Sequence, residues 1–332
     1  MSPCTRPGRS VVLVTGGAGY IGAHTVKDLL KHGHDVVVFD NLCAGHRELV
    51  LTAELFRGDL LDPDALRSCF DSFSFDSVVH FAALASVPDS IQDPEKYYQN
   101  NVTGGLNLLE VMREYDVKNL IFSSSAAIYG SPKEGPIPEE HPKNPESPYG
   151  RTKWIFEQIL EDYSRAYGLR SISLRYFNAA GADPSGQIGE WHSPESHLIP
   201  IVLEVAQGKR SQIEIFGADY DTPDGTCIRD FIHVSDLAEA HVLALQHLHD
   251  GPPCTAYNLG IGTGHSVREV VDTCRKVTGL AISTVESPRR PGDPPQLVAD
   301  SSRAERELGW RPRFPGLPEI VETAWEWQKR RD

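Results

Sequence analysis

The chain has 332 residues, of which 40% are hydrophobic and 23% are charged, and its formal net charge at pH 7 is -14. That length suits one large α/β unit or two closely connected domains, and the composition is that of an ordinary globular protein. The negative charge argues against general binding to nucleic acid or to an anionic membrane, so any phosphate group must be held by local contacts.

The six cysteines, Cys4 among them, are scattered without a Cys-x-x-Cys pair, which favours a reducing compartment over a disulfide framework. Residues 1–10 lack the apolar segment of a secretory signal, and no uninterrupted apolar run is long enough to span a bilayer. We therefore expect a cytoplasmic protein with neither a nucleic-acid partner nor a membrane partner.

Short β-branched runs alternate with helical patterns through the first half of the chain, which predicts an α/β fold with a doubly wound parallel sheet. The expected strands are Val11–Thr15, Asp35–Phe39, Leu55–Arg57, Ser77–Ala82, Asn119–Ser123 and Ser171–Tyr176. Between the first two, Ile21–His32 carries apolar residues on one helical stripe and is followed by Gly33, so these three segments form a βαβ unit.

The turn after the first strand, 15–22, reads Thr-Gly-Gly-Ala-Gly-Tyr-Ile-Gly. Gly16 permits the tight turn, Gly19 lets a pyrophosphate approach the backbone, and Gly22 lets the helix pack closely on the strand. Asp40, at the end of the second strand, offers a carboxylate that can bind the adenine ribose hydroxyls and would repel a 2'-phosphate. The pattern therefore predicts a Rossmann site that takes NAD rather than NADP.

Asp59 follows the third predicted strand. Two roles are open for its carboxylate: contact with the adenine edge, or capping of the next helix. The sequence does not choose between them.

Tyr149 and Lys153 stand four residues apart behind Ser147-Pro148, which predicts an N-cap followed by the first residue of a helix. At 3.6 residues per turn the two side chains share one face, so the ammonium lies near the phenol. Lowering the pKa of a tyrosine from near 10 to ~7 takes roughly 4 kcal/mol, which Lys153, a cationic cofactor and the positive helix end would together supply. Tyr149 is therefore a candidate base, although the pattern alone is common on protein surfaces.

Beyond about Asn178 the regular alternation ends, and glycine and proline become frequent, which indicates a second, smaller α/β region. The later segments Phe231–Val234 and Ala256–Leu259 look like strands that return to the main sheet, so we expect the two domains to interleave. The expected NAD-binding Rossmann domain is residues 1–178 with returning segments near 229–262, and the expected substrate domain is residues 179–228 and 263–332.

Together these motifs resemble the extended short-chain dehydrogenase/reductase superfamily, in which Gly-x-x-Gly-x-x-Gly precedes a serine run, here 123–125, and then Tyr-x-x-x-Lys. The finer matches are similar to the UDP-glucose (UDP-galactose) 4-epimerase family; they lie at residues 40–42, 122–130, 175–178, 229–234 and 257–260. The resemblance runs from about Val11 to Gln328. It implies bound NAD, a UDP-sugar substrate and a homodimer.

The resemblance also implies roles for individual residues. Ser125, Tyr149 and Lys153 would form the catalytic triad, with Ser125 and Tyr149 at the sugar 4-hydroxyl and Lys153 at the nicotinamide ribose. The implied cofactor contacts are Gly16, Gly19, Tyr20, Ile21, Gly22, Asp40, Asn41, Asp59, Leu60, Phe81, Ala82, Ala83, Asn100, Ser124, Tyr149, Lys153 and Tyr176. The implied substrate contacts are Ser125, Tyr149, Asn178, His197, Leu198, Phe216, Arg229, Arg290, Asp293 and Leu297.

Three positions depart from the pattern of the best-known bacterial members. Ala85 stands where some members have a lysine that contacts the cofactor, and His197 stands where an asparagine often contacts the diphosphate. Leu297 occupies a position whose size is thought to limit the sugar pocket. The first departure bears on how tightly NAD is retained, and the other two bear on the range of sugars.

The remaining histidines show no metal-ligand spacing; His46, His80, His233 and His241 are expected to be structural or surface groups, and no metal is expected. The helices predicted at Glu95–Glu114 and Tyr149–Tyr167 carry apolar faces. In families that resemble this one, that helix pair forms the homodimer seam, so we expect a homodimer.

The predicted activity is reversible inversion of carbon 4 of a UDP-hexose through a transient 4-keto sugar, with NAD taking and returning the hydride. A nucleotide-sugar 4,6-dehydratase shares the oxidation step but calls for a carboxylic acid pair near the serine run, where this chain has Ala126-Ala127. A non-catalytic NAD-binding sensor or scaffold is the other alternative. Such a role would not require Ser125, Tyr149 and Lys153.

Overall fold

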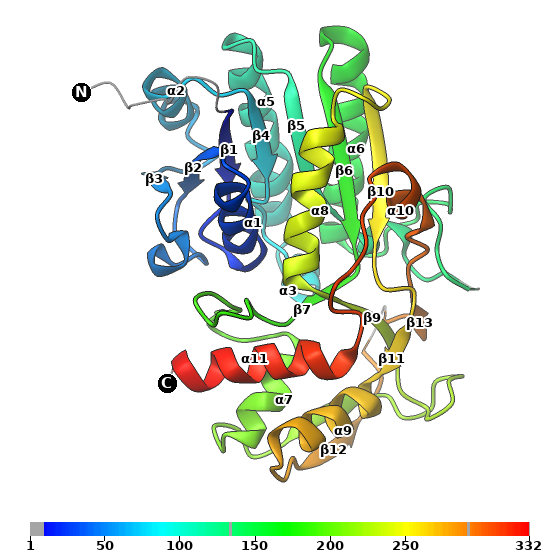
Figure 1. Ribbon diagram of the computed structural model, residues 1–332. Coiled ribbons are helices and arrows are strands. Elements are labelled where there is room, and N and C mark those ends of the chain that lie inside the picture. Colours follow the sequence, from blue (N-terminus) through cyan, green and yellow to red (C-terminus); the bar gives the residue numbers. More distant parts are fainter. Residues whose placement is uncertain (1–9, 133–134, 291–292, 332) are drawn as a thin grey trace.

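Seven parallel strands form the central sheet, in the order β10-β6-β5-β4-β1-β2-β3 (Figure 1). They are β1 Val11–Thr15, β2 Asp35–Asp40, β3 Glu54–Arg57, β4 Ser77–His80, β5 Asn119–Ser125, β6 Arg170–Tyr176 and β10 Cys254–Leu259. The predicted strands of the first half of the chain are therefore confirmed, with ends that differ by at most two residues. All five residues of β1 are buried, which suits a strand covered on both faces of the sheet.

The computed structural model describes residues 10–132, 135–290 and 293–331. Cys4 and the Pro291-Gly292 pair lie outside these ranges. The five described cysteines are free thiols: Cys43, Cys69, Cys227, Cys254 and Cys274. Within the described ranges, no helix combines the length and the apolar composition that crossing a membrane requires.

Helices cover both faces of the sheet (Figure 1). On one face lie α1 Tyr20–Lys31 and α8 Val234–His247, and on the other lie α2 Pro63–Ser72, α5 Gly104–Glu114 and α6 Pro148–Tyr167. Alternate side chains of β1 point to opposite faces, so Val12 packs in the first core and Leu13 in the second. The doubly wound architecture follows from this two-sided burial.

The single helix expected at Glu95–Glu114 is broken in the structure. α4 Pro94–Tyr98 leads into a π-helical turn at Gln99–Thr103 before α5 begins; a short helix, α3 Val87–Gln92, precedes them. The Asn101 amide explains the break, because it accepts a hydrogen bond from Leu84 N (2.8 Å) and donates to Leu84 O (3.0 Å). These bonds tie the turn to the loop after β4.

The second region lies beyond the carboxyl ends of the sheet (Figure 1). Its strands are β7 Asn178–Ala180, β8 Ile213–Phe216, β9 Ile228–His233, β11 Gly264–Ser266, β12 Thr284–Ser287 and β13 Gln296–Leu297. Three helices pack together beneath them: α7 Leu198–Ala206, α9 Val267–Thr278 and α11 Leu317–Arg331. A short helix, α10 Ser302–Glu307, packs against β10 instead.

One of the two strands expected to return to the main sheet does so. β10 joins the main sheet beside β6, whereas β9, which contains Phe231, pairs with β7, β11 and β13 in a separate sheet. The prediction for 231–234 was therefore wrong: apolar periodicity marks a buried strand but does not name its partner. The chain still interleaves, because α8 follows β9 directly and packs against α1. The domain boundaries given above remain a prediction.

Candidate active site

A cleft of about 910 Å³ lies at the carboxyl ends of the sheet, with walls from both regions. In an open parallel sheet this end is where ligands bind, because the strand order reverses there and the loops diverge. The loops after β1, β2, β4 and β5 form one wall, and β7, α7 and residues near β9 and β13 form the other.

The turn after β1 needs glycine at two positions. Gly16 has φ +73°, and a Cβ there would lie 2.5 Å from Ala82 N; a Cβ on Gly22 would lie 2.2 Å from Gly16 O. Gly22 therefore accommodates the turn backbone itself, rather than the close contact between helix and strand that the sequence suggested. Gly19 is the N-cap of α1 and provides no side-chain acceptor, which leaves this helix end to a ligand such as a pyrophosphate.

Asp40 and Asp59 both line this part of the cleft. Asp40 is 8% exposed and accepts hydrogen bonds from Ala18 N (3.0 Å) and Leu42 N (2.8 Å); burial raises its pKa, and these two bonds oppose the rise. Asp59 accepts from the Asn41 amide at 2.9 Å.

The helix-capping alternative for Asp59 was wrong. The N-cap of α2 is Asp62, whose side chain accepts from Asp64 N and Ala65 N, each at 3.1 Å. Asp59 instead accepts from Leu61 N at 2.8 Å, ahead of the helix. Contact with the adenine edge is the role left for Asp59, and it stays a prediction.

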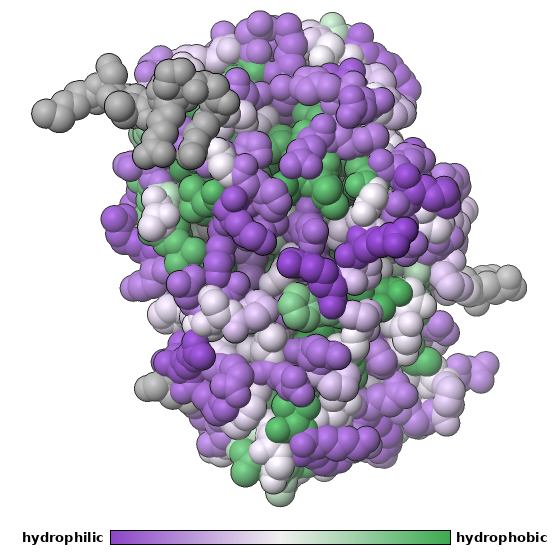
Figure 2. Space-filling model, in the orientation of Figure 1, coloured by the Kyte–Doolittle hydropathy of each residue, from purple (hydrophilic) through white to green (hydrophobic). Residues whose placement is uncertain are grey.

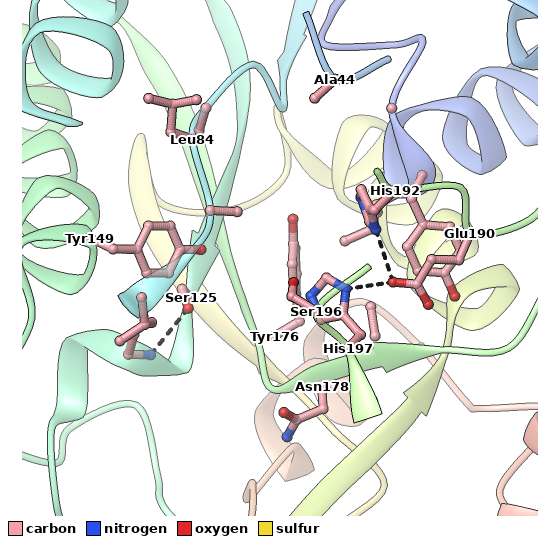
Figure 3. A pocket seen from close by; sticks show the side chains of 18 of the residues that line it. Ala44, Leu84, Ser125, Tyr149, Tyr176, Asn178, Glu190, His192, Ser196 and His197 are labelled. Atoms are coloured by element: carbon pink, nitrogen blue, oxygen red, sulfur yellow. Dashed lines mark hydrogen bonds and ion pairs between the residues drawn. The ribbon is translucent and has the colours of Figure 1, made fainter. Parts of the chain in front are cut away.

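The predicted start of α6 is confirmed: Ser147 Oγ accepts from Gly150 N at 3.1 Å, and Pro148 is the first helical residue. This start directs Tyr149 and Lys153 into the cleft, which Ser125 at the end of β5 also lines. Figure 3 shows Tyr149 and Ser125 close together. Lys153 Nζ donates to Ser123 O at 2.7 Å and lies 5.8 Å from the centre of the Tyr149 ring.

Burial is the largest influence on the pKa values of Tyr149 and Lys153. It raises the pKa of Tyr149, and hydrogen bonding by Ser125 opposes the rise. It also lowers the pKa of Lys153 to about 7, against the attraction of the Glu157 carboxylate. The protein groups around Tyr149 therefore do not lower its pKa below the ordinary value.

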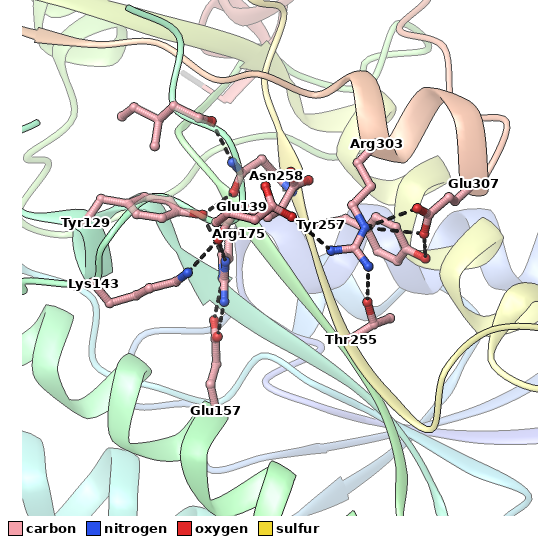
Figure 4. Close-up of polar contacts among 12 residues, drawn as sticks. Tyr129, Glu139, Lys143, Glu157, Arg175, Thr255, Tyr257, Asn258, Arg303 and Glu307 are labelled. Carbon is pink, nitrogen blue, oxygen red and sulfur yellow. Dashed lines mark hydrogen bonds and ion pairs between the residues drawn. The ribbon is translucent and has the colours of Figure 1, made fainter. Parts of the chain in front are cut away.

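Behind the triad lies a buried ion pair that was not predicted from the sequence (Figure 4). Arg175 donates to both carboxylate oxygens of Glu157, at 2.6 and 3.0 Å, and also to Tyr129 Oη at 2.9 Å. Ser124 donates to the same carboxylate and is fully buried, so it lies behind the cleft wall rather than in it. The sequence did contain one signal for this pair: Glu157 lies one helical turn after Lys153, on the same face of the predicted helix.

The opposite wall carries cationic and aromatic groups. The Arg290 guanidinium lies 3.8 Å from the centre of the Phe216 ring. Arg229 donates to Pro294 O at 2.9 Å, and its other terminal nitrogen lies 3.4 Å from the Asp293 carboxylate. Two guanidinium groups at one cleft wall suit the phosphate oxygens of a nucleoside diphosphate.

The stretch 190–197 adds a cluster of charged side chains to this wall (Figure 3). Glu190 raises the pKa of His197 to about 10, and burial opposes this rise. Burial lowers the pKa of His192, but the neighbouring Glu190 and Glu195 carboxylates outweigh burial and raise it to about 9. The family resemblance implies a site role for His197 alone, although the spacing Glu-x-His-x-x-Glu-x-His was a signal for the other three residues.

The cleft brings together all but one of the predicted site residues. Ser124 is the exception, and every other predicted cofactor or substrate residue lines the cleft. Ala85 lines it as well. Of the histidines expected to be structural, His80, His233 and His241 are buried.

The family model described as "NAD dependent epimerase/dehydratase family" matches residues 12–260. A curated relative, the UDP-glucose 4-epimerase of Halalkalibacterium halodurans, is 52% identical over 318 residues, which cover 96% of this chain and 95% of that protein. Two solved structures are also similar. The UDP-glucose 4-epimerase of Brucella ovis in complex with NAD is 48% identical, with a TM-score of 0.92 and coverage of 95% and 97%. The enzyme of Bifidobacterium longum in complex with NAD+ and UDP is 40% identical, with a TM-score of 0.92 and coverage of 97% and 98%.

Proposed function

Since the chain belongs to the NAD dependent epimerase/dehydratase family, we propose that it is an NAD-dependent isomerase that interconverts UDP-galactose and UDP-glucose. It inverts carbon 4 of the hexose. Similarity to UDP-glucose 4-epimerases over nearly the whole chain supports this activity, and so does the presence of NAD in the similar structures.

One observation carries the proposal: a single cleft holds a dinucleotide-binding turn, the Ser125, Tyr149 and Lys153 triad, and a wall with two arginines. A Cβ at Gly16 or Gly22 would clash with the protein's own backbone, so the turn needs glycine at both positions to keep its shape. When bound there, NAD supplies an acceptor and then a donor of hydride.

Tyr149 would accept the proton of the sugar 4-hydroxyl as carbon 4 is oxidised, and Ser125 would hold the same oxygen through its hydroxyl. Lys153 would stabilise the phenolate through its charge and bind the nicotinamide ribose. Its bond to Ser123 O fixes the ammonium between α6 and β5, where both tasks are within reach.

The opposite wall would hold the UDP portion through Arg229 and Arg290. Inversion requires the 4-keto sugar to turn over between hydride removal and hydride return. Firm binding of the diphosphate with loose binding of the sugar permits that rotation, because the sugar is attached to the diphosphate through rotatable bonds. The hydride then returns to the opposite face of carbon 4.

The alternatives fit the cleft less well. A 4,6-dehydratase needs a carboxylic acid pair beside the serine run, and there the cleft is lined by Ala126 and Ala127. An NAD-binding sensor would have no need for Tyr149 and Lys153 on one face of α6, directed into the same cleft as Ser125.

The test is to purify the protein without added NAD and incubate it with UDP-galactose. We expect UDP-glucose to form without net NADH accumulation, and denaturation to release a dinucleotide. Release of NADH in proportion to turnover would indicate a dehydrogenase, and a 4-keto-6-deoxy product would indicate a dehydratase. The absence of any conversion, together with retained dinucleotide, would favour the sensor.

We also propose a cytoplasmic homodimer that forms through α5 and α6. Tyr167, near the carboxyl end of α6, is 50% exposed, and the Arg113 guanidinium of α5 lies 5.2 Å from the centre of its ring. The face seen in Figure 2, which carries α1 and α8, is mainly hydrophilic with small apolar groups. Light scattering should give twice the chain mass, and Tyr167→Glu should reduce it.

A further inference from the structure

Four side chains of the stretch 190–197 direct ligand atoms to one point: Glu190, His192, Glu195 and His197, named here the 190–197 cluster. Each offers one atom, a carboxylate oxygen or an imidazole nitrogen, and the four atoms lie within 4.8 Å of one another. Figure 3 shows the two imidazole rings turned toward the Glu190 carboxylate.

The separations match a tetrahedral metal site. Glu190 Oε1 lies 2.6 Å from His197 Nδ1 and 3.2 Å from His192 Nδ1, and Glu195 Oε1 lies 3.4 and 3.8 Å from the same two atoms. Zinc bound at 2.0–2.1 Å by nitrogen and oxygen ligands makes a tetrahedron whose edges are about 3.3 Å. The four distances bracket that value.

Two buried atoms of the cluster have ion-pair contacts but no hydrogen bond of good geometry. Within the described residues, Glu190 Oε1 and His192 Nδ1 are buried atoms without a hydrogen-bond partner, although they lie 3.2 Å apart. Glu190 is only 7% exposed, so its carboxylate has little access to water. An ion bound to both atoms would satisfy them.

The charges agree. Among the described side chains, the ion pairs of Glu190 and Glu195 are with His192 and His197, and neither carboxylate pairs with a lysine or an arginine. A bound ion would displace the imidazole protons, and two carboxylates with two neutral imidazoles would then balance one divalent cation. Imidazole ligands disfavour magnesium and calcium, which prefer oxygen alone, and favour zinc and its neighbours.

We propose that the 190–197 cluster is a structural binding site for one divalent transition-metal ion, with zinc as the best fit. Four protein ligands close a tetrahedral site, so the ion has no open position for substrate and takes no part in the reaction. This inference goes beyond the proposed activity and does not depend on it.

The site would brace the cleft wall. His197 is the N-cap of α7, and Ser196 and Leu198 beside it line the cleft. His192 packs edge-on against Tyr20, the first residue of α1, at 6.3 Å between ring centres. An ion in the cluster would therefore hold the 190–197 loop in place between the start of α1 and the start of α7.

The test uses the full chain, stripped with a chelator and dialysed against limiting zinc. We expect one zinc ion per chain by mass spectrometry of the metal content, and cobalt substitution should give the strong visible absorption of a tetrahedral site. Zinc at a hundredfold excess over its Kd should raise Tm by about 5 °C.

Glu195→Gln keeps the shape of the side chain and removes one ligand charge, and His192→Ala removes one ligand. Each should weaken zinc binding at least about a hundredfold, since even the loss of an outer hydrogen bond costs ten- to a hundredfold. His46→Gln is the matched control, because His46 stacks on Trp191 at 3.9 Å but lies outside the cluster. It should bind zinc like the wild type.

Two results would overturn the proposal. If stripped wild-type protein binds no zinc and its Tm does not respond to zinc, the cluster is an ion-pair network of carboxylates and imidazolium groups. If the Glu195→Gln and His192→Ala variants retain zinc as well as the wild type does, the ion binds elsewhere. Circular dichroism of each variant confirms that it is folded, and none of these measurements requires turnover.

Discussion

Replacing Glu157 with glutamine should destabilise the protein by about 3 kcal/mol. The side chains of Glu157 and Arg175 are only 7% and 6% exposed, and removing one partner of a buried ion pair costs about 3–5 kcal/mol because the other charge stays buried. The low end applies, since Arg175 keeps its bonds to Tyr129 Oη and Glu139 O. At about 2 °C per kcal/mol, Tm should fall by about 6 °C.

The assay is denaturant unfolding together with calorimetry, and Glu161→Gln is the matched control. Glu161 lies one turn further along α6 and pairs with Arg165 at the surface, where it is 54% exposed. Its loss should cost less than about 0.5 kcal/mol. The double variant Glu157→Gln, Arg175→Met should recover most of the lost stability, because it removes both buried charges.

The same substitution should change the pH dependence of turnover. The Glu157 carboxylate raises the pKa of Lys153, so its removal lowers that pKa below about 7 and leaves less ammonium to stabilise the Tyr149 phenolate. The rise of kcat with pH should therefore move to higher pH. Two results would contradict a stabilising role for the Glu157–Arg175 ion pair: equal losses of stability in Glu157→Gln and Glu161→Gln, or additive losses in the double variant.

Three further predictions concern the cleft. Tyr149→Phe should lower turnover at least about a hundredfold and keep nucleotide binding, and near-normal rates in a folded variant would refute its role as base. Lys153→Met should lose a similar factor, with the remaining activity shifted to higher pH. The pKa of Lys153 falls from 10.5 to about 7 on folding, so at this site the unfolded chain binds more protons between these values. The contribution of Lys153 to stability should therefore rise with pH there, and urea titrations should show it as a difference in slope between the wild type and Lys153→Met. Leu297 lines the cleft, and we expect its size to limit the group that fits at carbon 2 of the sugar, so that the wild type turns over N-acetylated UDP-sugars only weakly. Leu297→Tyr should abolish this weak activity and Leu297→Ser should raise it, as measured in competition assays with both sugar pairs. Equal N-acetyl activity in the wild type and Leu297→Tyr would show that another residue sets this limit.

The sequence alone determined the strands of the first half of the chain and the start of the active-site helix. β1 is a run of buried residues that begins with Val11–Val14, and Ser147-Pro148 caps α6 through bonds within its own first turn. Such features are local, because the residues that form them are neighbours along the chain. The positive φ of Gly16 belongs to the same class, since it is a property of one residue, although the close approach of Ala82 to Gly16 comes from the fold.

Only the tertiary structure decided which distant groups meet. β9 reads as a strand from its own residues, but its place outside the main sheet depends on pairing with β7, β11 and β13. Ser124 follows the serine pattern, yet it is drawn away from the cleft by Glu157. The 190–197 cluster is spaced along an irregular segment whose periodicity predicts no shared face. The pairing of β9, the position of Ser124 and the assembly of the 190–197 cluster all depend on packing between distant segments and on the burial of charged groups. The free energies of these contacts depend on partners that a local sequence pattern does not specify.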